Sequence, residues 1–196
     1  LPDRYDDIKR VGLPMTPDLE IVKTLKPTDV ISPNSLQYDL QPQYESIKVP
    51  STFVNLMSVE GMFKSIQQLG VKYDRNEEAE ALIKDYNSFM QEYNESIEGR
   101  EKPRVLVLIG LPGLYMVGTD KSYVGNLVRL AGGENVFDSD EGAFLNVNTE
   151  AISATNPDII LRSAHGLPEE AKKMFAKEFK DNDIWKHFRA VQEEKV

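Results

Sequence analysis

The chain has 196 residues, 40% of them hydrophobic and 28% charged, which is ordinary for a globular protein. Its formal net charge of −9 argues against a nucleic-acid-binding surface, because such a surface needs a basic stripe. The absence of cysteine excludes disulfides, thiolate metal sites and cysteine nucleophiles within the chain, and two histidines argue against a multi-histidine zinc site. The sequence contains no run of 18 apolar residues, so no segment of it is expected to span a membrane.

The first 75 residues are predicted to alternate between helices and strands. The expected elements are a helix at 18–25, strands at 29–32 and 52–54, and a helix at 58–69. Thr16 or Asp18 is the expected N-cap of the first helix, and Gly70 is the expected C-terminal signal of the last. Residues 36–47 stay ambiguous, because Pro42 interrupts any helix there.

The clearest helix in the sequence lies between residues 76 and 99. Apolar residues recur in it at three- and four-residue spacing, and glutamates crowd its first turn, where the helix dipole favours them. A helix of about 22 residues is roughly 33 Å long. This exceeds what covering one small sheet requires, so we expect a strut that connects two bodies.

The second half of the chain again alternates. Residues 104–110 are a near-continuous apolar run, which is typical of a strand buried on both faces. After it we expect a short strand at 115–117, a helix ending at 130, a loop at 134–147, a short helix from 150 and a helix at 169–179. Thr119 or Asp120 is the expected N-cap of the helix that ends at 130, and Thr149 is the expected N-cap of the short helix from 150. Asn182 or Asp183 is expected to cap the last segment of the chain.

His165 follows a short apolar strand at residues 158–161. In an open α/β sheet, ligands bind at loops that leave the carboxyl ends of strands. His165 is therefore a candidate ligand-facing residue, while a hydrogen-bonded loop histidine is an equally good reading from position alone. The other histidine, His187, lies beside Trp185 and is interpreted as a structural or surface residue.

Two stretches of the chain resemble each other. The spacing from Glu20 to Pro27 is seven residues, as it is from Glu150 to Pro157, and a short apolar strand follows each proline. Since the two copies flank the long helix, we predict two similar lobes, 1–75 and 100–196, joined by a linking helix at 76–99. Each lobe is expected to be α/β with a mainly parallel sheet.

This bilobal layout resembles the helix-linked class (class III) of ABC-transporter substrate-binding proteins, which bind iron-siderophores, cobalamin or haem. Within that class the chain is similar to the IsdE-like haem-receptor lipoproteins of Gram-positive bacteria. The resemblance covers nearly the whole chain, and its motifs lie at residues 12–17, 25–28, 118–125, 131–136, 156–162, 165–170 and 182–188.

The resemblance implies that Met15 and His165 are the axial ligands of haem iron, one from each lobe. A thioether and a neutral imidazole both suit haem iron. Met15 lies between Pro14 and Pro17, a rigid setting for an exposed side chain. A packing methionine is the ordinary alternative.

The resemblance also assigns Glu20 and Glu150 to the outer faces of the lobes, where they pair with arginines of the permease. The alternative is that both are ordinary first-turn helix acids.

A haem pocket is a weaker expectation. Tyr115, Thr119 and Ser122 flank a strand-to-helix junction, where free amides attract anions such as haem propionates. Capping and core packing explain these residues equally well. Arg162 suits a propionate but also a salt bridge within its own lobe.

The function implied by the resemblance is a haem receptor that is not an enzyme and is monomeric. It receives haem from upstream haem-donor surface proteins and passes it to an ABC permease and its ATPase. Its place is the extracellular face of the cell membrane, through a lipid anchor on the full-length parent. Relative to complete members, we expect this chain to be truncated at both ends, without the lipid-bearing cysteine, the first strand and the final segment.

Two other classes compete with this reading. An iron-siderophore or cobalamin receptor of the same fold would not need Met15 opposite His165. An enzyme would need catalytic groups, and the sequence contains no nucleophile elbow, P-loop or clustered carboxylates.

Overall fold

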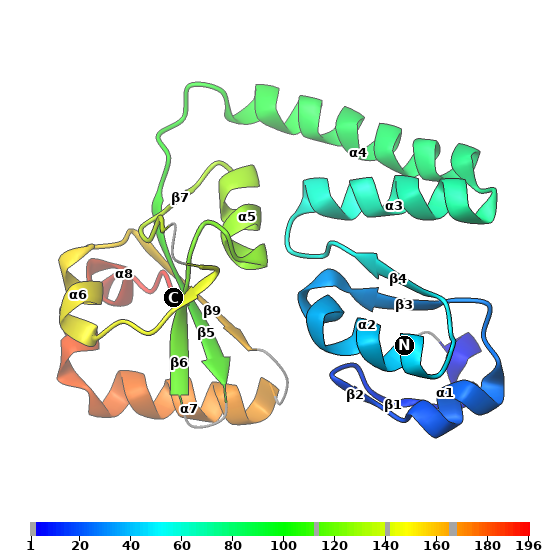
Figure 1. The fold of residues 1–196 in the computed structure, drawn as a ribbon. Coiled ribbons are helices and arrows are strands. Elements are labelled where there is room, and N and C mark those ends of the chain that lie inside the picture. Colours follow the sequence, from blue (N-terminus) through cyan, green and yellow to red (C-terminus); the bar gives the residue numbers. More distant parts are fainter. Residues whose placement is uncertain (1–2, 112–113, 140–141, 165–167) are drawn as a thin grey trace. The chain divides into compact units, whose positions relative to one another are not determined.

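The computed structural model describes residues 3–111, 114–139, 142–164 and 168–196. The chain divides into two compact units, Leu1–Leu56 (unit 1) and Met57–Val196 (unit 2), and each is described by itself (Figure 1). The lobe limits at 75 and 99 that we expected from the sequence stay a prediction. Within the described ranges, no helix is long and apolar enough to cross a membrane.

Unit 1 contains short helices and two small sheets. Its elements are η1 (Asp3–Tyr5), β1 (Gly12–Leu13), β2 (Thr16–Pro17), α1 (Leu19–Leu25), β3 (Val30–Pro33), η2 (Asn34–Leu36), α2 (Gln37–Ser46) and β4 (Ser51–Val54). β1 and β2 pair antiparallel, whereas β3 and β4 pair parallel, with Val30 opposite Ser51. Its buried apolar side chains include Val22, Leu40 and Tyr44.

Helix α2 resolves the ambiguity of residues 36–47, because it continues through Pro42. Pro42 is exposed. Its nitrogen carries no hydrogen, so it cannot donate to the carbonyl of Tyr38, one turn earlier, and Tyr38 lies on the same exposed side of the helix. Water can therefore satisfy that carbonyl. Leu40 and Tyr44, both buried, hold the opposite side of the helix on unit 1.

Unit 2 begins with two long helices and continues into a mixed sheet. Its elements are α3 (Val59–Tyr73), α4 (Asn76–Ile97), β5 (Arg104–Leu111), β6 (Leu114–Gly118), α5 (Tyr123–Leu130), β7 (Glu134–Asn135), β8 (Phe144–Leu145), α6 (Thr149–Ala154), β9 (Ile159–Ala164), α7 (Pro168–Asp181), η3 (Asp183–His187) and α8 (Arg189–Gln192). The predicted 22-residue helix is α4, and β7 and β8 lie in the part that we expected to be loop.

Strand β5 is the centre of the sheet in unit 2. β9 runs parallel along one edge of it, and β7 and β6 follow one another along the other edge. The β5–β9 and β5–β7 pairs are parallel as predicted, whereas β6 runs antiparallel to β5 and β8 antiparallel to β6. The sheet is therefore mixed, because only two residues separate the end of β5 from the start of β6, and so short a connection can join only antiparallel neighbours.

Both faces of β5 are buried, as its apolar run predicted. Leu106 and Leu108 pack into a core with Trp185 and Phe175, contributed by the last helices of the chain. The alternate positions of β5, with Val128 of α5, form the core on the opposite face. Alternating side chains thus place a helical layer on each side of the strand.

The structure corrects three predicted helix ends. Ser122 caps α5 and Asn148 caps α6, each accepting a hydrogen bond from the amide three residues later, so Thr119, Asp120 and Thr149 are not the caps. Helix α3 continues past Gly70 to Tyr73. A Cβ at Gly70 would lie 2.8 Å from Cβ of Ala79, so this glycine permits close packing of α3 on α4 rather than ending the helix.

Candidate functional site

Met15 lies at the tip of a tight hairpin in unit 1. Leu13 of β1 pairs with Thr16 of β2, so that Pro14 and Met15 form the two-residue connection between the strands. The Met15 side chain is 67% exposed. All six methionines of the chain lie in the described residues, and of these Met15 alone is exposed, whereas the other five are half-buried. This favours a ligand-facing thioether over a packing methionine.

The hairpin is fixed to the start of α1. The amide of Asp18 donates to the carbonyl of Val11 at 2.7 Å, and the Asp18 carboxylate accepts from the amide of Ile21 at 3.0 Å. Gly12 has φ +99, and a Cβ there would lie 2.8 Å from the carbonyl oxygen of Thr16. Only glycine fits this position without strain. Sequence reasoning missed the roles of Gly12 and Asp18 in placing Met15.

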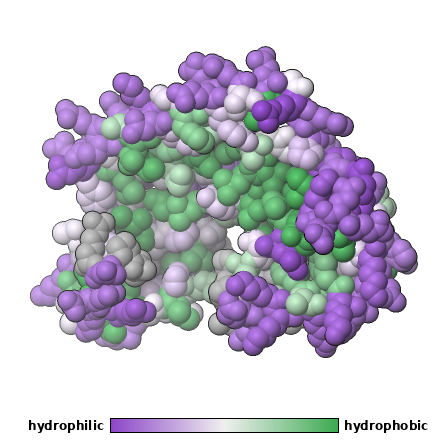
Figure 2. All heavy atoms as spheres, turned by 180° about the vertical axis from the view of Figure 1, so that it is seen from behind, coloured by the Kyte–Doolittle hydropathy of each residue, from purple (hydrophilic) through white to green (hydrophobic). Residues whose placement is uncertain are grey.

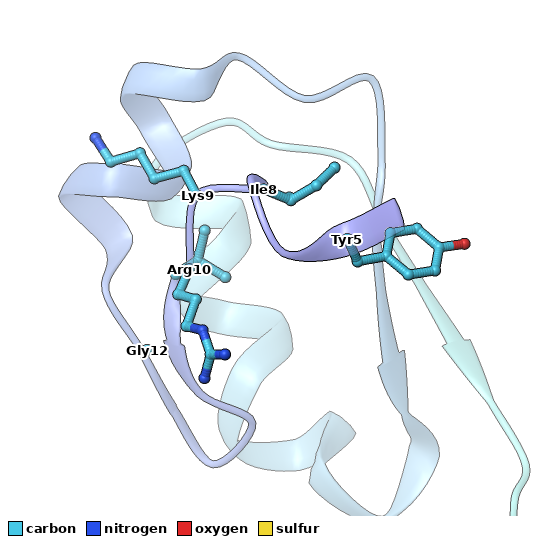
Figure 3. A pocket seen from close by; sticks show the side chains of 6 residues that line it. Tyr5, Ile8, Lys9, Arg10 and Gly12 are labelled. Carbon is cyan, nitrogen blue, oxygen red and sulfur yellow. The ribbon is translucent and has the colours of Figure 1, made fainter. Parts of the chain in front are cut away.

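Two cations lie on the segment that leads into this hairpin. An open pocket of about 350 Å³ is lined by residues 5 and 8–12. Figure 3 shows the side chains of Lys9 and Arg10, which extend from neighbouring positions of this segment in different directions. The remaining lining is largely apolar, with Ile8 61% exposed. Two cationic side chains thus border the pocket, and the same segment also carries the exposed acids Asp6 and Asp7.

His165 lies outside the described residues. The structure describes the strand before it, β9, which ends at Ala164, and the helix after it, α7, which begins at Pro168. β9 and β5 are parallel neighbours from Val105 to Gly110, so the strand that precedes His165 in the sequence ends at the carboxyl edge of a parallel pair, where ligands bind in α/β sheets. Met15 belongs to unit 1 and β9 to unit 2, and the pairing of Met15 with His165 stays a prediction.

Tyr115 of β6 is half-buried beside the aromatic core. Its ring centroid lies 6.2 Å from that of Phe175 and 6.1 Å from that of Trp185. Burial raises the pKa of the Tyr115 phenol; a hydrogen bond with Thr149 opposes the rise, and the neighbouring Glu178 carboxylate adds to it. The phenol thus lies among residues of α6 and α7.

Thr119 and Ser122 are fully buried, and their hydroxyl groups bond within the chain. The Thr119 hydroxyl donates to the carbonyl of Gly142 at 2.7 Å and accepts from the amide of Lys121 at 3.2 Å. The Ser122 hydroxyl donates to the carbonyl of Thr119 at 2.7 Å and accepts from the amide of Gly125 at 3.0 Å. This geometry favours the capping alternative for Ser122 and the core-packing alternative for Thr119, and their contact with a propionate stays a prediction.

Arg162 of β9 is exposed and lies over two aromatic rings. Its guanidinium carbon is 5.2 Å from the ring centroid of Phe179 and 6.0 Å from that of Phe175. A guanidinium stacked in this way keeps its charge and its outward N–H donors. The stacking holds the side chain near the carboxyl end of β9.

Glu20 and Glu150 occupy equivalent positions in the two units. Each is an exposed residue in the first turn of a short helix, α1 or α6, that is followed by a parallel strand. Across the described ranges, neither carboxylate takes part in an ion pair. His187, in contrast, lies at the end of η3, exposed beside the buried Trp185.

Two α/β units that each contain this helix–strand repeat, with a long helix between the two copies in the sequence, define a bilobal binding protein. A family model described as periplasmic binding protein matches residues 1–196, and the chain belongs to this family.

The comparisons also identify similar individual proteins. The high-affinity heme uptake system protein IsdE of Staphylococcus aureus (strain bovine RF122 / ET3-1) is 48% identical over 197 residues, which cover 100% of this chain and 68% of that protein. The crystal structure of S. aureus IsdE complexed with heme matches with a TM-score of 0.91 and 48% identity, covering 100% of this chain and 76% of that chain. An ABC transporter substrate-binding protein from Listeria monocytogenes EGD-e matches with a TM-score of 0.89 and 47% identity, with the same coverage.

Proposed function

We propose that this protein is the haem-binding receptor of an ABC importer for haem-iron uptake. The observation that carries the proposal is the match to the haem complex of IsdE, which extends over the whole chain at 48% identity. The exposed Met15 thioether, held on an anchored hairpin, supports it. Recognition would come from iron ligation, an apolar surface for the porphyrin and polar groups at the propionates.

Met15 and His165 are the proposed axial ligands of haem iron. A thioether favours soft metal states, and Met/His ligation tends to raise the reduction potential of haem iron. Of the other proposed pocket residues, Arg162 has the clearest case, because its guanidinium is exposed. Tyr115, Thr119 and Ser122 would act by shaping the wall of the site.

The partners form part of the same proposal. Glu20 and Glu150 would dock the receptor on arginines of the permease, which works with its ATPase, and surface haem-donor proteins would supply the ligand. The protein would act as a monomer at the extracellular face of the cell membrane, lipid-anchored in its full-length form. It would transfer haem without changing it chemically, so it is not an enzyme.

The test is a haemin titration followed by absorption spectroscopy. We expect a ligand-shifted Soret band with the native chain and an altered band with Met15→Ala and with His165→Ala. His187→Ala and Met62→Leu serve as matched controls and should leave the spectrum unchanged. Unchanged spectra in both ligand variants would overturn the assignment. A native chain that produces no shifted band would favour a siderophore or cobalamin receptor.

A further inference from the structure

The side chain of Arg162 lies on the face of the unit 2 sheet that α7 covers. Ile160, two residues earlier on β9, is fully buried in the core that contains Phe175 of α7, and alternate residues of a strand point to the same face. The guanidinium carbon of Arg162 is 5.2 Å from the ring centroid of Phe179 and 6.0 Å from that of Phe175. Arg162 is nevertheless exposed, so its charge remains accessible to a ligand.

Phe179 is the outer member of a stack of three aromatic rings. Its ring lies almost parallel to the indole of Trp185, with 10° between the planes and 4.3 Å between the centroids. The ring of Phe188 packs on Trp185 in turn, at 5.0 Å and 26°. Phe179 is half-buried, whereas Trp185 and Phe188 are 0% and 3% exposed. The stack thus leads from the core of unit 2 to the guanidinium of Arg162.

Hydrogen bonds fix the central ring of this stack. Oε1 of Glu178 accepts from the indole N–H of Trp185 at 3.2 Å and from the side-chain amide of Asn182 at 2.9 Å. Oδ1 of Asn182 accepts from the amide of Ile184, in η3, at 3.2 Å. A close-packed indole whose N–H is satisfied keeps one orientation. The ring of Phe179, which packs on this indole, is therefore a fixed surface for Arg162.

Stacking on a fixed ring prepares Arg162 to bind an anion. An exposed arginine loses side-chain freedom when it binds a ligand. A guanidinium that is already stacked has lost part of this freedom beforehand, and it keeps its charge and its planar fork of donors. The fork matches the two oxygens of a carboxylate. Arg162 is therefore preorganised for a carboxylate group, such as a haem propionate.

An apolar surface cannot supply the same selectivity. Figure 2 shows, on one face of the molecule, apolar side chains gathered between hydrophilic ones. Such a surface takes up a porphyrin ring whatever groups the ring edge carries, because the hydrophobic effect is not directional. A choice between porphyrins with and without free carboxylates needs a charged group in a fixed place.

We propose that Phe179 is a positioning residue that holds the guanidinium of Arg162 for a haem propionate. It thereby makes the receptor selective for porphyrins with free carboxylates. Phe179 acts through Arg162 and needs no contact with the haem itself. The inference rests on the proposed function, because haem is the ligand that it concerns.

The test compares haemin with iron protoporphyrin dimethyl ester, which has the same ring and iron but no anionic groups. Both ligands are titrated in the same detergent, with the Soret band as the readout. The native chain should bind haemin about tenfold more tightly than the ester, the effect of one charge-assisted hydrogen bond. Phe179→Leu should reduce this preference by about two- to fivefold, the range for a cation–π contact at an exposed site, without moving the Soret maximum. Arg162→Gln should remove most of the preference.

Three further variants separate positioning from general damage. Phe179→Tyr keeps the ring and should keep the native preference. The combination of Phe179→Leu with Arg162→Gln should lose no more preference than Arg162→Gln alone, because Phe179 acts through the guanidinium. Phe89→Leu, at an exposed site of α4, is the matched control and should behave as native. Phe179→Met replaces Phe179→Leu if circular dichroism shows that the latter is not folded.

A second measurement needs no haem. In NMR spectra of the chain with ¹⁵N-labelled arginine, the ring current of Phe179 should displace the side-chain resonance of Arg162, and Phe179→Leu should return it toward its ordinary position. An unchanged resonance, an unchanged preference, or an equal loss of affinity for haemin and the ester in this variant would overturn the proposal. Failure of the native chain to bind haemin would refute the proposed function, and the resonance would still decide whether Phe179 holds Arg162.

Discussion

Asp18 and Asn148 make the same hydrogen bond in the two units of this protein. Oδ1 of Asp18 accepts from the amide of Ile21 at 3.0 Å, and Oδ1 of Asn148 accepts from the amide of Ala151 at 2.8 Å. In both units this bond starts a short helix that precedes a parallel strand. The similarity read from the sequence is therefore a structural repeat.

The repeat extends from the cap to the end of each helix. Val22 of α1 and Ile152 of α6 are the buried residues of their helices. Lys26 and Asn156 each adopt a left-handed conformation, with φ of 48° and 43°, directly before a proline. Because the two helices begin with the same cap and end at the same turn, they expose equivalent faces. Each helix carries an exposed glutamate in its first turn, Glu20 in α1 and Glu150 in α6.

The two caps give the first prediction. Asp18→Ala and Asn148→Ala should each destabilise their own helix by about 1 kcal/mol, the usual effect of losing a side-chain N-cap. Hydrogen exchange at the amides of Ile21 and Ala151 reports each helix separately. Asp18→Asn keeps an acceptor and is the control. If a single variant accelerated hydrogen exchange in both helices, the prediction that each cap stabilises only its own helix would be wrong.

The paired glutamates give the second prediction. Combined charge reversal, Glu20→Lys with Glu150→Lys, should leave haem binding intact and reduce haem transport, because the carboxylates would no longer meet permease arginines. Haem uptake is measured in cells that express the permease and its ATPase, beside the haemin spectrum of the purified variant. The combination of Glu80→Lys with Glu92→Lys, at two exposed sites of α4, controls for the same change in net charge. Native uptake by the double variant would refute docking through these residues.

Gly12 gives the third prediction. Gly12→Ala should lower the free energy of unfolding by about 1–3 kcal/mol, the usual range for backbone strain of this kind. It should also weaken haem ligation, because the new Cβ would push against the carbonyl of Thr16 and displace Met15. Gly99→Ala is the matched control: Gly99 also has positive φ (+73), but a Cβ there has open space.

Urea unfolding and the haemin spectrum provide the two measurements for this pair. Equal losses of stability in both variants would show that φ strain alone matters at Gly12. A native Soret band in Gly12→Ala would show that the hairpin does not position an iron ligand.

The local order of the chain was largely predictable. The 22-residue helix α4 and the buried strand β5 followed from periodicity and from an unbroken apolar run, because both signals are properties of neighbouring residues. The helix–strand repeat around Glu20 and Glu150 was visible as a matched spacing. Caps were less certain, because Thr119, Asp120 and Ser122 all suit an N-cap, and the chosen residue depends on the geometry of the incoming turn.

The sequence by itself determined the α/β alternation and the repeat, since spacing and local preference carry those, while the candidacy of Met15 came from the family resemblance. Tertiary structure alone decided what Gly12, Gly70 and Asn126 do. Gly12 closes the hairpin on α1, Gly70 lets α4 approach α3, and Oδ1 of Asn126 in α5 accepts a hydrogen bond from the amide of Val59 at the start of α3. Each role depends on an atom from another element, and no local pattern in the chain encodes that neighbour.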